Sequence, residues 1–179
     1  MDTCETEFSE KDKTIVLKTA RLTLTKDDFI FTPPSDLDMS GAPKEATVTA
    51  KDGIDCGAIT VKYYDANNTK LDSAPKKVGT YTVKIDVVAN DTYRAITDLE
   101  VGSFTILPIT LTKDDITVTG IGNEIYTGSQ IKPEPSVWYA ASGTLEKDTY
   151  YTLAYGTNTD IGTGSVTINF KGSYAGSLT

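Results

Sequence analysis

A six-residue stretch occurs twice in this chain of 179 residues. Thr23–Asp28 (TLTKDD) returns letter for letter as Thr110–Asp115, 87 residues further along. Similarity at a fixed period is typical of a tandem array of one structural unit. A chain of this length forms one domain or two, and the repeat favours two of about 85 residues each. We therefore expect an N-terminal extension over 1–21, a first module over 22–107 and a second over 108–179.

The first module contains several short runs with the composition of β-strands. In the clearest of them, Tyr81, Val83, Ile85 and Val87 alternate with polar residues, which predicts a sheet with one buried and one solvated face. Proline, serine, aspartate and glycine over 33–45 predict a loop. The expected strands are Phe29–Thr32, Ala46–Thr49, Ala58–Asp65, Thr80–Val87 and Ser103–Leu107.

The second module repeats this plan. Ile116–Thr119 corresponds to 29–32, Ser136–Val137 to 47–48 and Ile161–Ile168 to 78–85, while Gly128 corresponds to Gly41 and Tyr174 to Tyr93. No counterpart of Phe104–Ile106 precedes Thr179. We therefore expect the second module to lack its last strand, with an exposed sheet edge or a borrowed strand there.

The N-terminal extension is polar and acidic. Residues 1–13 show no periodicity, and we expect them to be poorly ordered unless they pair with a strand. Lys13–Leu17 is interpreted as the closing strand of an upstream module, or as a substitute for it. The start of the chain does not have the pattern of a signal peptide, and no apolar run reaches the roughly 20 residues of a membrane span. These features predict a segment of a longer protein.

Helical periodicity is missing from the sequence. No stretch of ten residues has an apolar period of 3.6, and turn signals separate short strands at intervals of roughly 8–12 residues. This pattern predicts an all-β fold of two tandem immunoglobulin-like antiparallel β-sandwich modules. A β-grasp-like or another small all-β module is the alternative.

Several motifs together resemble a known bacterial family. The first module contains Leu24–Asp28, Gly41–Val48 (GAPKEATV) and Val78–Val83 (VGTYTV), and the second contains Tyr126–Gly128 with Ile131–Pro133. The chain thus resembles the MBG type of bacterial immunoglobulin-like repeat over nearly all of residues 22–179. The first module departs from this pattern, with Met39 at the place of Tyr126. The resemblance implies an exported, multi-repeat protein of the cell surface or medium, in which such modules serve as spacers, stalks or adhesive surfaces.

Composition excludes several classes of function. The net charge of −8 argues against nucleic acid and against anionic membranes, since both attract a basic surface. The chain has no histidine, which removes histidine-based catalytic dyads and the commonest zinc ligand. We expect no catalytic residues, no cofactor and no metal. Cys4 and Cys56 occupy non-equivalent places, so they are either two free thiols or one bridge.

Paired aspartates are the most prominent acidic feature. Adjacent strand residues point to opposite faces, so Asp27–Asp28 and Asp114–Asp115 are poorly placed for joint catalysis. An aspartate that accepts backbone N–H bonds at a turn explains their recurrence, and calcium binding is the alternative. Asp36, Asp38 and 52–55 are weaker calcium candidates, because the spacing of a calcium loop is missing. No lysine, asparagine and aspartate trio is marked out for an isopeptide crosslink.

Aromatic doublets supply the candidate binding residues. In each of Tyr63–Tyr64, Trp138–Tyr139 and Tyr150–Tyr151, strand alternation turns one ring outward. We expect the exposed rings to be Tyr64, Trp138 and Tyr150, and an exposed ring can stack on a sugar.

These sequence features favour two functions. The first is a non-catalytic spacer or stalk segment whose partners are the neighbouring repeats of the same polypeptide. The alternative is a module that binds a glycan or a host protein through Trp138, Tyr150 or Tyr64.

Overall fold

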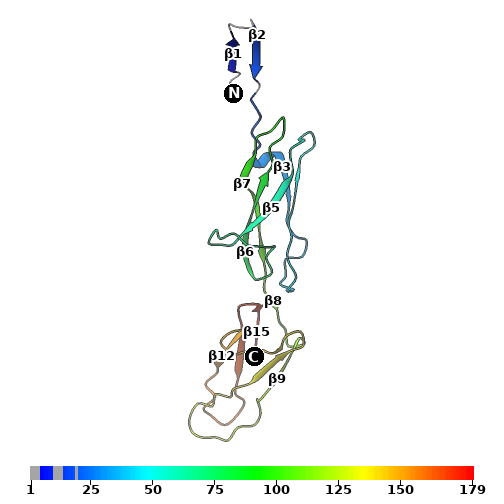
Figure 1. Ribbon diagram of the computed structural model, residues 1–179. Coiled ribbons are helices and arrows are strands. Elements are labelled where there is room, and N and C mark those ends of the chain that lie inside the picture. The colour runs from blue at the N-terminus through cyan, green and yellow to red at the C-terminus, as the bar shows by residue number, and fades with distance from the viewer. Residues whose placement is uncertain (1–4, 10–13, 19) are drawn as a thin grey trace. The chain divides into compact units, whose positions relative to one another are not determined.

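The computed structural model describes residues 5–9, 14–18 and 20–179. The protein is all-β, with 41% of its described residues in strands and several antiparallel sheets, which is consistent with a β-sandwich. The described residues divide into two compact units (Figure 1), of which the first includes Pro43–Thr105 and residues up to Leu37, and the second includes Asp38–Ala42 and Ile106–Thr179. None of the described helical residues form a segment long and apolar enough to cross a membrane.

The N-terminal residues form a hairpin of their own. β1 (Glu5–Ser9) pairs antiparallel with β2 (Thr14–Lys18), from Glu5 opposite Lys18 to Ser9 opposite Thr14. The strand expected at 13–17 is therefore present, but in the described part of the chain it pairs with β1, not with either module. Within 1–13, residues 5–9 pair with a strand, which is the condition under which the sequence predicts order. The prediction for 1–4, with Cys4, and for 10–13 lies outside the described residues.

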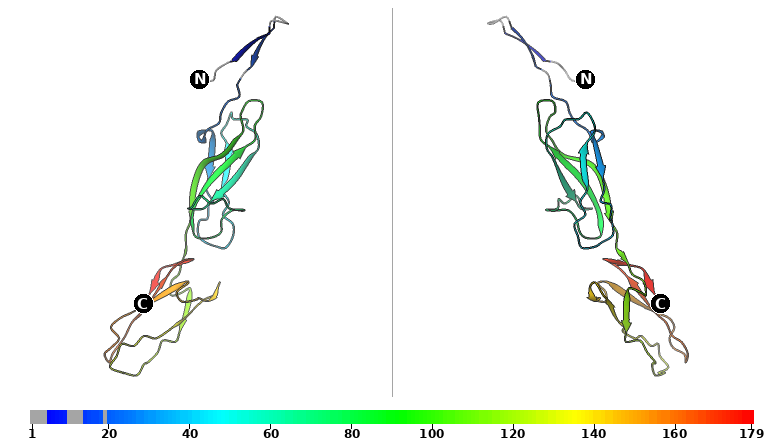
Figure 2. Two further views of the ribbon diagram at one scale, coloured as in Figure 1. Left: turned by 60° about the vertical axis from the view of Figure 1, so that its left-hand side comes forward. Right: turned by 90° about the vertical axis from the view of Figure 1, so that its right-hand side faces the viewer.

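Besides the β1–β2 pair, the described residues of unit 1 form two sheets (Figure 2). After the 3-10 turn η1 (Lys26–Asp28), β3 (Phe29–Thr32) pairs antiparallel with β4 (Thr47–Ala50). The second sheet has the order β5–β6–β7, from β5 (Ile59–Tyr64), β6 (Gly79–Val87) and β7 (Ile96–Ile106). The predicted strands at 29–32, 46–49, 58–65 and 80–87 are confirmed to within two residues at each end.

The core of unit 1 lies along β6. Tyr81, Val83, Ile85 and Val87 are all buried, and Val83 and Ile85 are completely inaccessible to solvent, as the alternation of the sequence predicts. At Gly102 of β7 an added Cβ would overlap the ring of Phe31 from β3. Glycine at this position therefore allows the two sheets to approach each other closely.

Unit 2 follows a related plan. One sheet has the order β11–β10–β9, from β9 (Ile116–Thr119), β10 (Ser136–Tyr139) and β11 (Gly143–Thr144). The other has the order β12–β13–β15, from β12 (Tyr151–Tyr155), β13 (Val166–Phe170) and β15 (Ser177–Leu178). A parallel pair joins β8 (Ile109–Thr110) to β14 (Tyr174–Ala175). The buried core of this unit is made of Leu111, Val137, Leu145, Tyr151, Ile168, Phe170 and Tyr174.

Two predictions for unit 2 need correction. The strand expected at 161–168 begins only at Val166, and Ile161 is 87% exposed. The repeat equates Gly164 with the buried Tyr81, so the first half of this segment has no core side chain to bury. A closing strand is also present, since Ser177 and Leu178 of β15 pair with Asn169 and Ile168 of β13. β15 lies beside β13 in unit 2 as β7 lies beside β6 in unit 1, although β15 is much shorter.

Equivalent backbone contacts recur in both units. Leu22 forms a parallel bridge with Tyr93, and 87 residues later Ile109 pairs in parallel with Tyr174. We call each of these contacts a tyrosine bridge. The turn glycines match as well, because Gly41 and Gly128 have φ values of 78° and 74°. The alignment of the two repeats is therefore one of backbone conformation as well as of sequence.

Candidate functional site

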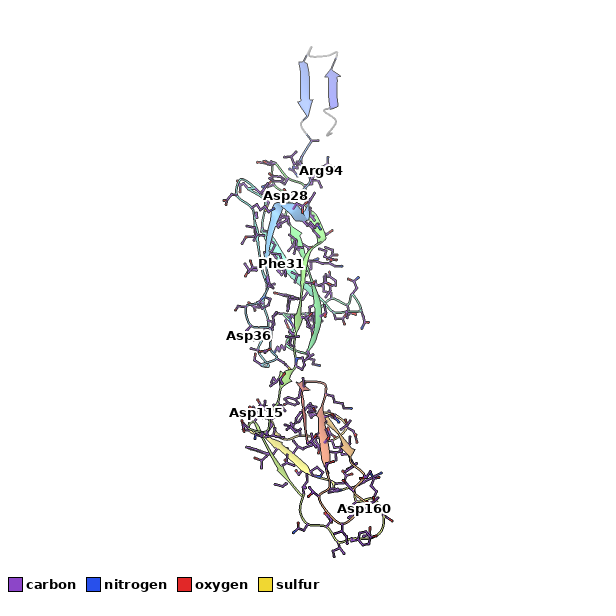
Figure 3. All side chains as sticks on the ribbon, turned by 180° about the vertical axis from the view of Figure 1, so that it is seen from behind. Asp28, Phe31, Asp36, Arg94, Asp115 and Asp160 are labelled. Atoms are coloured by element: carbon purple, nitrogen blue, oxygen red, sulfur yellow. The ribbon has the colours of Figure 1, made fainter. Side chains whose placement is uncertain are left out.

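The paired aspartates hold turns together. The Asp28 carboxylate accepts hydrogen bonds from the Thr25 backbone N–H at 2.7 Å and from its hydroxyl at 3.0 Å. Asp115 accepts the same two bonds from Thr112, at 2.8 and 2.6 Å (Figure 3). We call this arrangement the Thr–Asp turn. The bonds from Thr112 hold the pKa of the Asp115 carboxyl below its ordinary value, because they stabilise the charged form. These carboxylates therefore act as local acceptors, as the turn interpretation predicts.

The weaker calcium candidates are also drawn into local contacts. Asp36 lies 2.7 Å from the ammonium group of Lys44, whose side chain is only 5% exposed. Over the residues that the structure describes, no three acidic or cysteine side chains are gathered closely enough to hold a metal ion. Cys56 has a half-buried free thiol.

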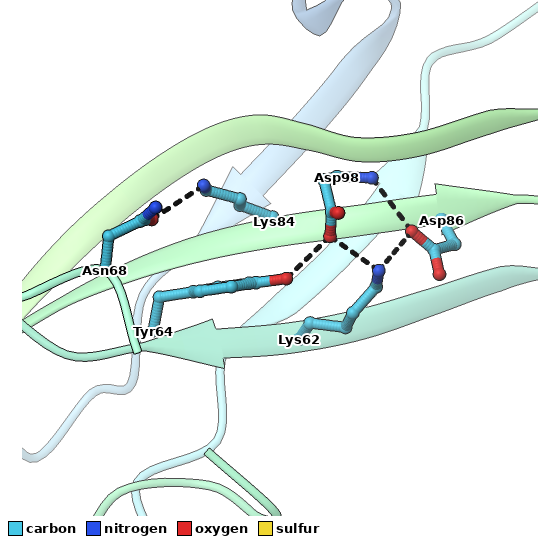
Figure 4. A network of polar contacts seen from close by, with 6 residues as sticks. All are labelled: Lys62, Tyr64, Asn68, Lys84, Asp86 and Asp98. Atoms are coloured by element: carbon cyan, nitrogen blue, oxygen red, sulfur yellow. Dashed lines mark hydrogen bonds and ion pairs between the residues drawn. The ribbon is translucent and has the colours of Figure 1, made fainter. Parts of the chain in front are cut away.

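A polar network covers the outer face of the β5–β6–β7 sheet (Figure 4). The Lys62 ammonium group lies 2.5 Å from Asp86 and 2.6 Å from Asp98, and its side chain is 11% exposed. Asp98 has a φ of 55°, and its backbone N–H donates to Asp86 at 2.9 Å. These hydrogen bonds raise the pKa of Lys62 and lower the pKa values of Asp86 and Asp98.

This network contains the residue types of an isopeptide crosslink without the conditions for one. Attack on a carboxyl group requires a neutral amine, and the raised pKa of Lys62 keeps its amine protonated. Asp98 is 54% exposed, so its carboxylate is partly solvated and ionised. The network is therefore an ion-pair cluster that ties three strands together.

The sequence predicts that Tyr64 and Tyr150 are exposed, but Tyr64 is buried and Tyr150 is half-buried. Tyr64 does point to the outer face, but its hydroxyl donates to Asp98 at 2.6 Å and the Lys84 ammonium group lies 4.4 Å from its ring centre. These side chains cover the ring and leave 8% of the residue exposed. Tyr150 precedes β12 in a turn, where alternation does not apply. Its half-buried ring packs at 5.5 Å against Tyr174 of the core.

Trp138 is exposed as predicted, with 45% of its surface accessible, while its neighbour Val137 is fully buried. It lies opposite Thr117 of β9 on one side and Thr144 of β11 on the other. Strand alternation places Thr119 and Ser136 on the same side of the sheet. We call the exposed surface formed by Thr117, Thr119, Ser136, Trp138 and Thr144 the Trp138 face.

The sequence predicts the exposure of Trp138 but not the hydroxyl residues that surround it. β11 is only two residues long, and its first residue, Gly143, has a φ of 76°. Two residues are too few to show a period. In the sequence, only the alternating Thr117 and Thr119 of β9 could have indicated that hydroxyl residues line this face.

A hollow of about 470 Å³ opens between two loops of unit 2, and Ile121, Tyr126 and Ile161 form part of its wall. Asn158 lies in the same wall, but its amide group is occupied by Ser165, whose N–H donates to Asn158 Oδ1 at 2.8 Å. Nδ2 of Asn158 in turn donates to the Ser165 carbonyl at 2.9 Å. The Asn158 amide in this hollow holds the backbone of Ser165, whereas the hydroxyl residues of the Trp138 face are exposed. The Trp138 face is therefore the better candidate site.

The chain was compared with known proteins in three ways. No protein family, no curated protein and no solved structure matches it.

Proposed function

We propose that the chain is a pair of tandem immunoglobulin-like modules that act as a non-catalytic spacer or stalk in a bacterial surface or secreted protein. The observation that carries this proposal is the recurrence of the Thr–Asp turn and the tyrosine bridge in both units. What the repeats share is a set of contacts that fix the backbone. A repeat selected for chemistry would instead share reactive side chains. The resemblance to MBG repeats supports the same assignment.

The tyrosine bridge also suits a module that carries load. In unit 2 the Ile109 N–H donates to the Ser173 carbonyl at 3.0 Å, and the Leu111 N–H donates to the Ala175 carbonyl at 2.9 Å. β8 begins the unit and β14 lies close to its end, and the two strands are parallel. Tension applied to the two ends pulls these strands in opposite directions, so their hydrogen bonds are sheared together. Bonds that break together resist more force than bonds that open one at a time.

Single-molecule extension of the full chain between two handles tests the spacer role. We expect two discrete unfolding events, each releasing roughly 3.5 Å of length per unfolded residue. Ile109→Pro removes the donor to Ser173 and should lower the unfolding force of one event while leaving the other unchanged. Leu22→Pro, at the equivalent position of unit 1, is the matched control and should affect the other event. Smooth extension of the unmodified chain without discrete events would contradict the proposal.

A further inference from the structure

The Trp138 face is uncharged in a strongly acidic protein. β9, β10 and β11 contain no charged residue at all, although the chain has a net charge of −8. An anionic ligand would be repelled by the protein as a whole, and a cationic ligand finds no carboxylate on these strands. Charge therefore selects a neutral ligand for this face.

The geometry of the face defines the shape of that ligand. Trp138 lies on the central strand, and neighbouring strands are about 4.8 Å apart, so the threonines at its two cross-strand positions flank the indole. Each hydroxyl both donates and accepts hydrogen bonds. A flat apolar ring edged by hydroxyls matches a pyranose, which has an apolar C–H face and hydroxyls around its rim.

A protein partner fits this surface less well. A stable protein interface buries about 800 Å² on each side around apolar anchors. The Trp138 face offers one aromatic side chain among four small hydroxyl residues. A surface of five residues with one aromatic ring is suited to contact one or two sugar rings.

We propose that the Trp138 face binds a neutral polysaccharide by stacking one pyranose on the indole, with hydrogen bonds to Thr117 and Thr144. This binding is a separate activity from the spacer role, and neither requires the other. A stalk with such a face would also adhere to the glycan.

Unit 1 provides a natural comparison. Thr49 on β4 lies opposite Ile30 of β3, as Trp138 lies opposite Thr117. The β3–β4 sheet has two strands, so no residue stands in the place of Thr144. The proposed glycan site therefore lies in unit 2 and has no counterpart on the β3–β4 sheet of unit 1.

The experiment combines affinity-gel electrophoresis with intrinsic fluorescence, using neutral glucans, mannans and galactans and, as an acidic comparison, polygalacturonate. Trp138 is the only tryptophan in the sequence, so fluorescence excited selectively in tryptophan, and not in the ten tyrosines, reports on this residue. We expect at least one neutral polysaccharide to retard the full chain and to change the fluorescence saturably. Polygalacturonate should have no such effect.

Variants then locate the site. Trp138→Ala, and Trp138→Thr that copies unit 1, should abolish retardation, while Thr144→Val should weaken binding a few-fold, up to about tenfold. Tyr126→Ala removes a ring that is 59% exposed in the connection between β9 and β10, outside the five residues of the Trp138 face, and should leave binding unchanged. Far-UV circular dichroism checks that each variant is folded. Absence of retardation across the neutral panel, or undiminished retardation of Trp138→Ala, would overturn the proposal.

Discussion

At the scale of single residues, the repeated stretch serves the backbone. The identical letters Thr-Lys-Asp-Asp produce the same two bonds to Asp28 and Asp115. A side chain that accepts its neighbour's N–H fixes a turn locally, without help from distant parts of the chain. This is why sequence alone was enough to predict the acceptor role of Asp28 and Asp115. Both aspartate pairs lie in turns, however, so the strand alternation expected for them does not apply.

Asp115→Ala should lower the stability of unit 2. It removes both bonds from Thr112, whereas Asp114→Ala removes one charge from the same turn and keeps them. The pKa of Asp115 is lowered in the folded state, so its stabilisation is present above the ordinary value of 3.8 and is lost as pH falls through the folded value. The urea midpoint, followed by Trp138 fluorescence, should fall for Asp115→Ala at pH 7. The difference from wild type should shrink at pH 2. Equal midpoints for the two variants at pH 7 would contradict this role.

At the scale of elements, β7 shows where prediction from sequence fails. The sequence predicts only its last part, from Ser103, but the strand begins at Ile96. The less exposed residues fall at Ile96, Leu99 and Val101, and then at Gly102, Phe104 and Ile106. Alternation therefore shifts phase at Asp98, whose φ is positive, and again near Gly102. A period-2 search finds the regular half of such a strand and misses the irregular half.

The predicted exposure was wrong for two of the three candidate aromatic rings, Tyr64 and Tyr150, because strand alternation alone does not determine exposure. Alternation assigned Tyr64 to the correct face, but exposure depends on Asp98 and Lys84, which reach it across the sheet. No local pattern contains that information. Trp138 was predicted correctly because its neighbours on the strands are small residues that cannot cover an indole.

The Lys62 network should make unit 1 sensitive to pH at both extremes. Its carboxyls, Asp86 and Asp98, have lowered pKa values, so their stabilisation is lost as pH falls below about 3.8. Lys62 has a raised pKa, so its contribution is complete below the ordinary value of 10.5 and is lost as pH rises through the folded value.

Lys62→Met keeps the buried stem and removes the charge. We expect a lower urea midpoint than wild type at pH 7, with the two proteins converging toward pH 2. Lys51→Met, in an exposed turn, is the control and should follow wild type throughout. Far-UV circular dichroism with urea, repeated from pH 2 to 11, measures both. A constant gap between Lys62→Met and wild type across this range would show that the network does not act electrostatically.

At the scale of the whole molecule, each unit has a core of its own. Ile85 is fully buried in unit 1, and Ile168 occupies the equivalent position in unit 2 with 3% exposure. The repeat made this division predictable, because a sequence that occurs twice encodes the same core twice. The boundaries of the expected modules rest on the same six-residue marker.

Separate cores predict separate unfolding. Ile85→Ala leaves a cavity in unit 1 and should cost about 2–5 kcal/mol there. Because Trp138 lies in unit 2, its fluorescence transition in urea should not move, while part of the circular dichroism transition shifts to lower urea. Ile168→Ala is the matched variant and should move the fluorescence transition instead. A shift of the fluorescence midpoint in Ile85→Ala would mean that the units unfold as one.

The tyrosine bridge and the Thr–Asp turn have a consequence for how such a chain diversifies. Both are made by a few residues at fixed offsets, and neither involves the outward side of the strands. After duplication, each copy keeps its frame as long as these positions are kept. Its surface is then free to change, as Thr49 and Trp138 show at one shared position. A lineage can therefore acquire new surface chemistry on one copy while the other copy stays as it was.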